Sequence, residues 1–177
     1  MPTSLTFQLS RVSTPLGVML VATDSDGRLR VLDWENYEAR MRRLIDRLYG
    51  KDAVTLVDGD GKGPVFDKLA AFFAGDVHAI DDIPVETGGT VFQRDVWAAL
   101  RDIPAGETRS YGQLARTIGR PAAVRAAGLA IGSNPIGLVV PCHRVIGANG
   151  ALTGYAGGLE RKAWLLKHEG AQGAHVA

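Results

Sequence analysis

A polar segment at residues 80–89 divides the chain near its middle. It contains Pro84 and ends in the paired glycines Gly88 and Gly89, a composition typical of a connection rather than of a helix or strand. The chain has 177 residues, enough for one full-sized domain or for two small ones. We therefore expect an amino-terminal structural domain over residues 1–85 and a second domain over residues 86–177.

The first half has the pattern of a small sheet with helices. Residues 5–12, 18–23 and 29–34 are apolar runs that predict strands, and an Asp26-Gly27 turn signal precedes the third. Residues 54–57 predict another strand. Asn36 is a candidate cap for a helix that ends at Gly50, and a second short helix should end at Gly75. No residue pattern here indicates chemistry, which favours a scaffolding role.

The second half begins with helix signals. Thr90 and Gln93 have the spacing of a capping box, and Pro104 should close the helix that follows. Ser110 and Gln113 repeat the same spacing and predict a short second helix.

Gly119 should end this short helix, and Pro121 is placed to open another that runs to about Ile131. Two short helices joined by a Gly-Arg-Pro turn resemble a helix-turn-helix. Alanine and glycine dominate the second of them, and Arg125 is its one charged residue. Small residues let a backbone lie close to a neighbouring helix or to DNA, and both interpretations remain open.

The remaining elements surround the only cysteine of the chain. Residues 138–140 predict a short buried strand that delivers Cys142, and residues 154–158 predict a flexible loop around Tyr155. A last helix is expected over residues 159–169, with Trp164 and Leu165 facing inward.

Charge differs between the halves. Residues 1–89 have a net charge of −4 and residues 90–177 one of +5. No carboxylate occurs between Glu107 and Glu160, whereas five arginines do. Such a stretch suits a phosphate backbone, although a solvated basic surface explains it equally well.

Cys142 is the only cysteine in the sequence, so an internal disulfide and a zinc site built from several thiolates are excluded. A lone buried cysteine is usually inert, and a reactive one needs a base or positive charge beside it. His143 and Arg144 follow directly. Because neighbours on an extended chain point to opposite sides, His143 would need a bend or a bridging water to reach the thiol. Its orienting acid could be any of five carboxylates, and Glu169 is one candidate.

The motif PCHRVIG, preceded by SNPIGLVV and followed by LTGYAGG, ERKAWLL and HEG, resembles the O6-alkylguanine-DNA alkyltransferases, also called methylated-DNA–protein-cysteine methyltransferases. The similarity covers residues 89–170 and extends more loosely to TPLG and LAAFFAGD in the first half. It implies direct-reversal DNA repair: an alkyl group, mainly methyl, passes irreversibly from O6-alkylguanine to Cys142 after the nucleotide leaves the stack. Each molecule would act once.

The resemblance also implies roles for other residues. His143 would take the thiol proton through a water and be held by Glu169, while Tyr111 would protonate or hydrogen-bond the departing guanine. Asn134 would fix the turn before the cysteine. Arg125 would fill the gap that the flipped nucleotide leaves in the base stack. The other implied DNA contacts are Ala126, Ala127, Gly128, Ser110 and Tyr111. The implied pocket is the backbone of Val145 with Tyr155, Ala156 and Gly157.

Taken alone, three of these residues have ordinary explanations. Tyr111 could pack on its own helix, Asn134 could be a turn residue before Pro135, and Tyr155 could anchor a loop.

Two departures from the family pattern also matter. Ile131 stands where a polar residue or methionine is more usual, which bears on DNA affinity. The first half has no cysteine and only His78, so the zinc site of some relatives is not expected, and no cofactor is either.

Three other functions compete. An alkyltransferase-like protein would bind damaged guanine without repairing it, but intact PCHRV argues against this. A thiol hydrolase could use Cys142, His143 and Glu169 and would turn over repeatedly. A helix-turn-helix regulator would tolerate serine at Cys142.

We expect an α+β fold: a small ribonuclease-H-like sheet-and-helix domain followed by a winged-helix-like domain with a helix-turn-helix.

The expected partner is double-stranded DNA containing O6-alkylguanine; whether O4-alkylthymine is accepted stays open. The chain has no apolar run of about 18 residues and no signal-peptide pattern at its start, which predicts a cytoplasmic protein without membrane contact. We expect a monomer.

Overall fold

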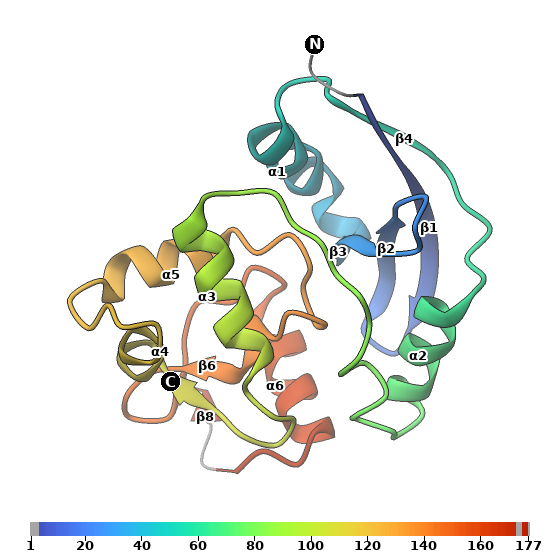
Figure 1. Cartoon of the computed structure of the whole chain (residues 1–177). Coiled ribbons are helices and arrows are strands. Elements are labelled where there is room, and N and C mark those ends of the chain that lie inside the picture. Colours follow the sequence, from blue (N-terminus) through green and yellow to red (C-terminus); the bar gives the residue numbers. More distant parts are fainter. Residues whose placement is uncertain (1–3, 173–174, 177) are drawn as a thin grey trace. The chain divides into compact units, whose positions relative to one another are not determined.

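The computed structural model describes residues 4–172 and 175–176, and the chain forms two compact units, residues 1–89 and 90–177. The division falls four residues after the expected boundary at residue 85. Residues 86–88 fold with the first unit because the backbone N–H of Glu86 donates to Leu29 O and that of Gly88 donates to Tyr49 Oη. The α+β character is as expected: a sheet with helices in the first unit and mainly helices in the second (Figure 1).

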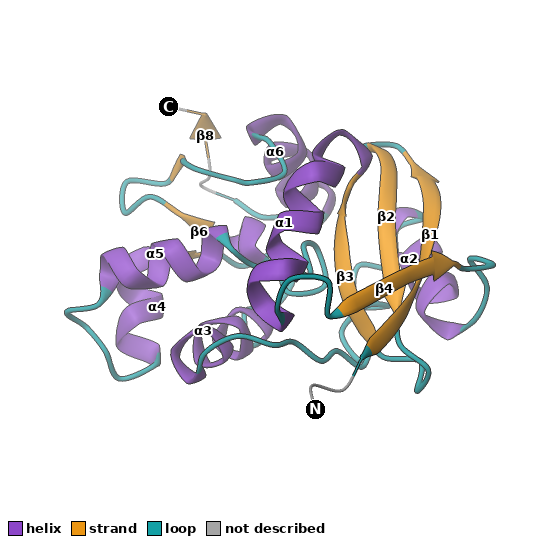
Figure 2. Cartoon of the chain, turned by 90° about the horizontal axis from the view of Figure 1, so that it is seen from above, coloured by secondary structure: helices purple, strands orange, loops and turns teal. Residues whose placement is uncertain are grey.

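A four-stranded sheet organises the first unit (Figure 2). The strand order is β3-β2-β1-β4, in which β1 and β2 pair antiparallel, β2 and β3 pair antiparallel, and β4 runs parallel to β1. The elements of this unit are β1 (Leu5–Thr14), β2 (Gly17–Thr23), β3 (Leu29–Trp34), η1 (Glu35–Tyr37), α1 (Glu38–Tyr49), β4 (Val54–Asp58) and α2 (Pro64–Phe73). All four predicted strands are therefore confirmed.

Helix α1 covers the sheet with an apolar stripe. Met41 and Ile45, one turn apart on the helix, pack against Phe7 and Val31 of the strands. The expected cap was wrong. Residues 35–37 form a 3₁₀ turn, so α1 begins only at Glu38 and no side chain caps it. Gly50 ends the helix as expected, with a φ of 104° that favours glycine.

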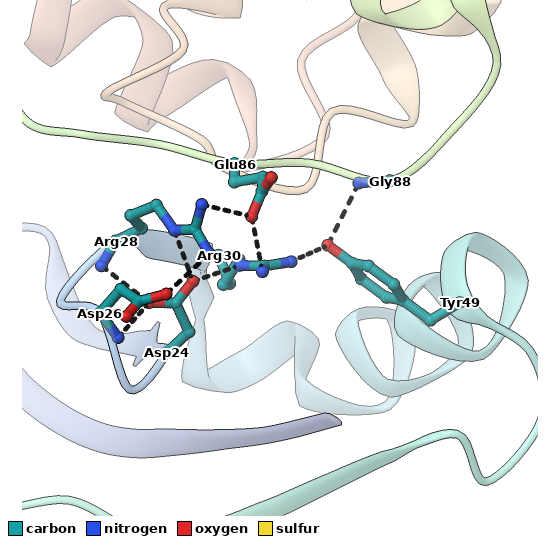
Figure 3. A network of polar contacts seen from close by, with 7 residues as sticks. All are labelled: Asp24, Asp26, Arg28, Arg30, Tyr49, Glu86 and Gly88. Atoms are coloured by element: carbon teal, nitrogen blue, oxygen red, sulfur yellow. Dashed lines mark hydrogen bonds and ion pairs between the residues drawn. The ribbon is translucent and has the colours of Figure 1, made fainter. Parts of the chain in front are cut away.

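A polar network fixes the connecting segment to the first unit (Figure 3). Buried Arg30 donates to Asp24 at 2.7 Å, to Glu86 at 2.7 Å and to Tyr49 Oη at 3.3 Å, and its guanidinium lies 5.0 Å from the centre of the Phe7 ring. Because Glu86 belongs to the connection and Asp24 to the β2–β3 turn, Arg30 joins segments distant in sequence.

The second unit is a group of helices with short strand pairs. Helices α3, α4 and α5 contact one another pairwise, and the indole N–H of Trp97 on α3 donates to Ala130 O on α5 at 2.8 Å. The elements are α3 (Val91–Arg101), β5 (Arg109–Ser110), α4 (Tyr111–Thr117), α5 (Val124–Gly132), η2 (Cys142–Arg144), β6 (Val145–Ile146), β7 (Ala151–Leu152), α6 (Leu159–His168) and β8 (His175–Val176). Strands β5 and β6 pair parallel, as do β7 and β8.

Both predicted capping boxes are confirmed, at Thr90 with Gln93 and at Ser110 with Gln113. Pro121 does not open a helix. It lies in a turn closed by the Ala123 N–H to Arg120 O bond, and α5 starts at Val124. In α6, Leu165 is fully buried, but Trp164 is only partly buried and stacks on His168. Within residues 4–172 and 175–176 no helix has the length and apolarity needed to cross a membrane.

Candidate active site around Cys142

The residues just before Cys142 form a turn and not the predicted strand. Residues 137–139 are turn residues, and Leu138 has a φ of 70°, which is incompatible with an extended run. Asn134 holds this turn from both sides: its Nδ2 donates to Val140 O at 2.8 Å, and its Oδ1 accepts from the Ile136 N–H at 3.0 Å. The amide therefore fixes the backbone that leads into Cys142.

Cys142, His143 and Arg144 form the 3₁₀ helix η2, and all three side chains are buried. A 3₁₀ helix has three residues per turn, so consecutive side chains point about 120° apart rather than to opposite sides. The chain is therefore not extended between Cys142 and His143: it bends at η2, and a bend was one of the two routes, with a bridging water, by which His143 was expected to reach the thiol.

Glu169 is the carboxylate that meets His143. Both carboxylate oxygens lie 3.0 Å from His143 Nε2. Arg144 binds the same carboxylate with two donors, Nε to Oε1 at 3.0 Å and Nη2 to Oε2 at 2.7 Å, and its Nη1 donates to Ile103 O at 2.6 Å. Both side chains of this bidentate pair are buried, and the two parallel hydrogen bonds fix the orientation of the Glu169 carboxylate.

The protonation of this group follows from its surroundings. Burial alone raises the pKa of the Glu169 carboxyl, but the charges and hydrogen bonds of His143 and Arg144 outweigh burial and lower the pKa to about 2. Burial lowers the pKa of His143, and the attraction of Glu169 opposes it only in part. A carboxylate can only accept, so Nε2 carries the hydrogen of the neutral ring and Nδ1 is left as an acceptor. Nδ1 is buried and has no hydrogen-bond partner among the described residues.

Tyr111 lies between helix α5 and the 154–158 loop. Its Oη donates to Thr153 O at 3.4 Å, and a methyl group built on Gly128 would lie 3.9 Å from its ring. It is the first residue of α4, directly after Ser110, whose Oγ accepts the Gln113 N–H in the capping box. The helix start thus sets the position of the Tyr111 ring.

Helix α5 has two different faces. Arg125 and Ala126 are exposed and Gly128 is half-buried, whereas Ala127, Ala130 and Ile131 are buried against the rest of the unit. Two expectations change. Ala127 is fully buried, so its side chain does not lie on the exposed face with Arg125, and Ile131 does not lie there either. The small residues of α5 thus serve both helix packing and an exposed surface.

The expected pocket residues lie at different depths. Val145 is fully buried in β6 and Gly157 is buried, while Tyr155 is half-buried and Ala156 is exposed. Val145 adjoins η2 directly, and the other three belong to the loop that begins beside Tyr111.

Two residues of this site were missed in the sequence. Arg144 was noticed only as a positive charge near the thiol, but it is the second partner of Glu169. Lys162 is fully buried on α6, and its Nζ donates to Thr153 O at 2.8 Å. Its spacing was the signal: Lys162 falls three residues before Leu165 and four before Leu166, both buried, and so lies on the inward stripe of the helix. Within the described ranges no three His, Cys, Asp or Glu side chains are placed to hold a metal ion.

Comparison with known proteins gives consistent matches. Residues 91–171 match the model of the 6-O-methylguanine DNA methyltransferase DNA-binding domain. The chain is 53% identical over 160 residues to a methylated-DNA–protein-cysteine methyltransferase of Shigella flexneri, covering 90% of this chain and 94% of that protein. It is 59% identical over 159 residues to the protein of the same name from Mycolicibacterium paratuberculosis, covering 89% of each. Among solved structures, it is similar to Mycobacterium tuberculosis OGT in complex with DNA, with a TM-score of 0.73, 38% identity, and coverage of 94% of this chain and 93% of that one.

Proposed function

Because this chain belongs to the 6-O-methylguanine DNA methyltransferase family, we propose that it repairs DNA by direct reversal, moving an alkyl group from O6-alkylguanine to its own Cys142. The alkyl group is mainly methyl, and the thioether formed is not reversed, so each molecule acts once. It is thus a methylated-DNA–protein-cysteine methyltransferase of single turnover.

The arrangement of three side chains carries this proposal. Cys142 precedes His143 in the same 3₁₀ turn, and Glu169 holds Nε2 of that histidine at 3.0 Å. This leaves Nδ1 as a buried acceptor. A cysteine, a base and an acid that orients the base form the arrangement that activates a thiol for nucleophilic attack.

The reaction needs the thiol proton to leave before attack. His143 Nδ1 takes it through a bridging water, and Glu169 stabilises the imidazolium that results. The sulfur then forms a bond to the alkyl carbon while the bond from that carbon to O6 breaks, and the guanine receives a proton. Tyr111 supplies a hydrogen bond or proton to the departing base, turning its hydroxyl from Thr153 O. Tyr155, Ala156 and Gly157, with the Val145 backbone, enclose the base.

Helix α5 and the positive charge of the second unit support DNA as the partner. An alkylated O6 inside a duplex cannot be reached, so the nucleotide must leave the stack at a cost of about a few kcal/mol. Arg125, on the exposed face of α5 beside Ala126 and Gly128, fills the vacated position and offsets part of this cost. Five arginines and no carboxylate between residues 108 and 159 favour a phosphate backbone.

Finer features of the fold are part of the proposal. The strand order β3-β2-β1-β4, with β4 parallel to β1, supports a ribonuclease-H-like first unit. Helices α4 and α5, separated by a short turn, support a helix-turn-helix in a winged-helix-like second unit. A monomeric state and a cytoplasmic location stay predictions from the sequence, as does acceptance of O4-alkylthymine.

The test is the intact mass of the protein after incubation with excess duplex containing one O6-methylguanine. We expect a gain of one methyl group, about 14 Da, located on Cys142 by peptide mapping. The controls are the same duplex without the lesion and Cys142→Ser, which should bind the duplex without gaining mass. Unchanged wild-type mass with preferential binding to the lesion would indicate a recognition protein. Unchanged mass without preference would favour a hydrolase or a regulator.

A further inference from the structure

Helix α6 begins with two adjacent cations that donate to the backbone of the segment before it. Arg161 Nη1 donates to Gly157 O at 3.0 Å, and Lys162 Nζ donates to Thr153 O at 2.8 Å. Thr153 lies immediately before the 154–158 loop, and Gly157 lies near the end of that loop. Two neighbouring residues of one helical turn therefore hold the loop at both of its ends.

The stability of the helix does not explain why these cations are placed there. The first backbone hydrogen bond of α6 runs from the Lys162 N–H to Gly158 O at 3.1 Å, so Arg161 and Lys162 belong to the first turn. The amino-terminal end of a helix has a partial positive charge, which favours acids such as Glu160 and disfavours cations. The gain from placing Arg161 in this turn comes instead from its contact with the loop.

The composition of the loop makes such a contact necessary. Three of its five residues are glycines, and glycine loses more conformational freedom on ordering than any other residue. One turn bond, from the Gly158 N–H to Tyr155 O at 2.9 Å, lies within the loop. Gly157 is buried and Arg161 is half-buried, so water screens their charge-assisted hydrogen bond only in part. Arg161 thus opposes movement of Gly157.

We propose that Arg161 sets the width of the pocket and thereby the size of the alkyl group that is transferred. It is a positioning residue that acts through the carbonyl of Gly157. The inference rests on the proposed function, in which Tyr155, Ala156 and Gly157 enclose the alkylated base. A loop held at Gly157 closes around a methyl group, whereas a longer alkyl chain requires the loop to move outward against the Arg161 bond.

A purely structural role for Arg161 gives a different expectation. If Arg161 only stabilised α6, its removal would slow the transfer of every alkyl group by the same factor. If it sets the width of the pocket, its removal slows the transfer of methyl while sparing or speeding that of a longer chain. The ratio of the two rate constants, measured on the same protein, therefore separates the two roles.

The experiment measures single-turnover transfer by the full chain from two duplexes that differ only in the lesion, O6-methylguanine or O6-butylguanine. Arg161→Met removes the donor and keeps an unbranched side chain, and Lys167→Met, at an exposed position of the same helix, is the matched control. We expect the methyl-to-butyl ratio to fall about ten-fold in Arg161→Met, a typical effect of losing a hydrogen bond to a charged group. The ratio should be unchanged in Lys167→Met. Arg161→Lys should recover most of it, because Lys162 makes the same kind of bond from the next residue.

A second measurement needs no DNA. Hydrogen–deuterium exchange of the free protein, followed by mass spectrometry of the peptide that covers residues 153–160, reports how often the loop opens. Exchange should be about ten-fold faster in Arg161→Met than in the wild type, because the loop has lost one of its bonds. Lys167→Met should exchange as the wild type does. If Arg161→Met does not fold, Arg161→Gln, which removes the charge and keeps a polar side chain, should show both changes to a smaller extent.

Three results would overturn the proposal: an unchanged methyl-to-butyl ratio in the folded variant, methyl and butyl rates that fall by the same factor, and unchanged exchange of the loop. Failure of the proposed function is distinguishable from these. In that case the wild-type protein would take no alkyl group from either duplex, yet exchange of the loop would still respond to Arg161.

Discussion

Glu169→Gln would remove the carboxylate that receives hydrogen bonds from both His143 and Arg144. The change keeps the size of the side chain but leaves Arg144, a residue only 3% exposed, without a negative partner for its guanidinium. Breaking one partner out of a buried ion pair costs roughly 3–5 kcal/mol, because the remaining charge stays desolvated. We expect the free energy of unfolding at pH 7 to fall by about 3 kcal/mol.

The pKa of Glu169 gives a second route to this magnitude. Its folded value of about 2 lies below the ordinary value of 4.5, and the difference corresponds to about 3 kcal/mol. Since the folded pKa is lowered, this stability is present above pH 4.5 and is lost as the pH falls from 4.5 toward 2. Glutamine cannot titrate, so wild type and variant should converge over that range.

Urea unfolding followed by circular dichroism, at several pH values between 3 and 8, measures this difference. Glu160→Gln is the matched control, because Glu160 lies exposed in the first turn of α6. A loss below about 1 kcal/mol at pH 7, or a loss that does not shrink below pH 4.5, would refute the pairing energy assigned here. If Glu169→Gln does not fold, the acid limb of the wild-type curve alone tests the reasoning.

Three further predictions concern the scaffold, and urea unfolding of the full chain checks the first two. Thr90→Ala removes the capping box of α3 and should cost about 1 kcal/mol, with no change in Cys142 reactivity. Arg30→Met removes one of the two guanidinium groups that bind the part-buried Asp24 and counter the effect of burial on its pKa, and leaves that of Arg28; stability should fall, and the loss should shrink as the pH drops below about 4. A loss that is constant with pH would contradict this. Asn134→Ala removes one of the two donors to Val140 O, the other being the Cys142 N–H, and should lower the methyl-transfer rate in a single-turnover assay, while an unchanged rate would make Asn134 an ordinary turn residue.

Local features of the fold could be predicted because neighbouring residues determine them. The capping boxes at Thr90 and Ser110 depend on residues three positions apart, and both formed as the spacing indicated. The strands of the first unit followed from apolar runs bounded by turn signals. Predictions failed where the local signal was weak: Asn36 and Pro121 are both acceptable near a helix start, but each lies in a turn before its helix.

Part of the active site could also be predicted from the sequence. The pairing of Cys142 with His143 and the candidate Glu169 came from the motif and its resemblance to a family. The sequence could not select Glu169 from the five acids of the second half by physical reasoning, because His143 and Glu169 are 26 residues apart and meet only when α6 packs beside η2. That packing also buries Lys162.

The sequence by itself therefore determined the four strands of the first unit, the two helices with capping boxes and the residue types available for alkyl transfer. Tertiary structure decided three things: that a turn and a 3₁₀ helix replace the strand before Cys142, that Arg144 shares Glu169 with His143, and that α5 buries Ala127 while exposing Arg125. The physical reason is that helix propensity and capping act over three or four residues. Burial and ion pairing depend instead on which segments, distant in sequence, pack against one another and exclude water.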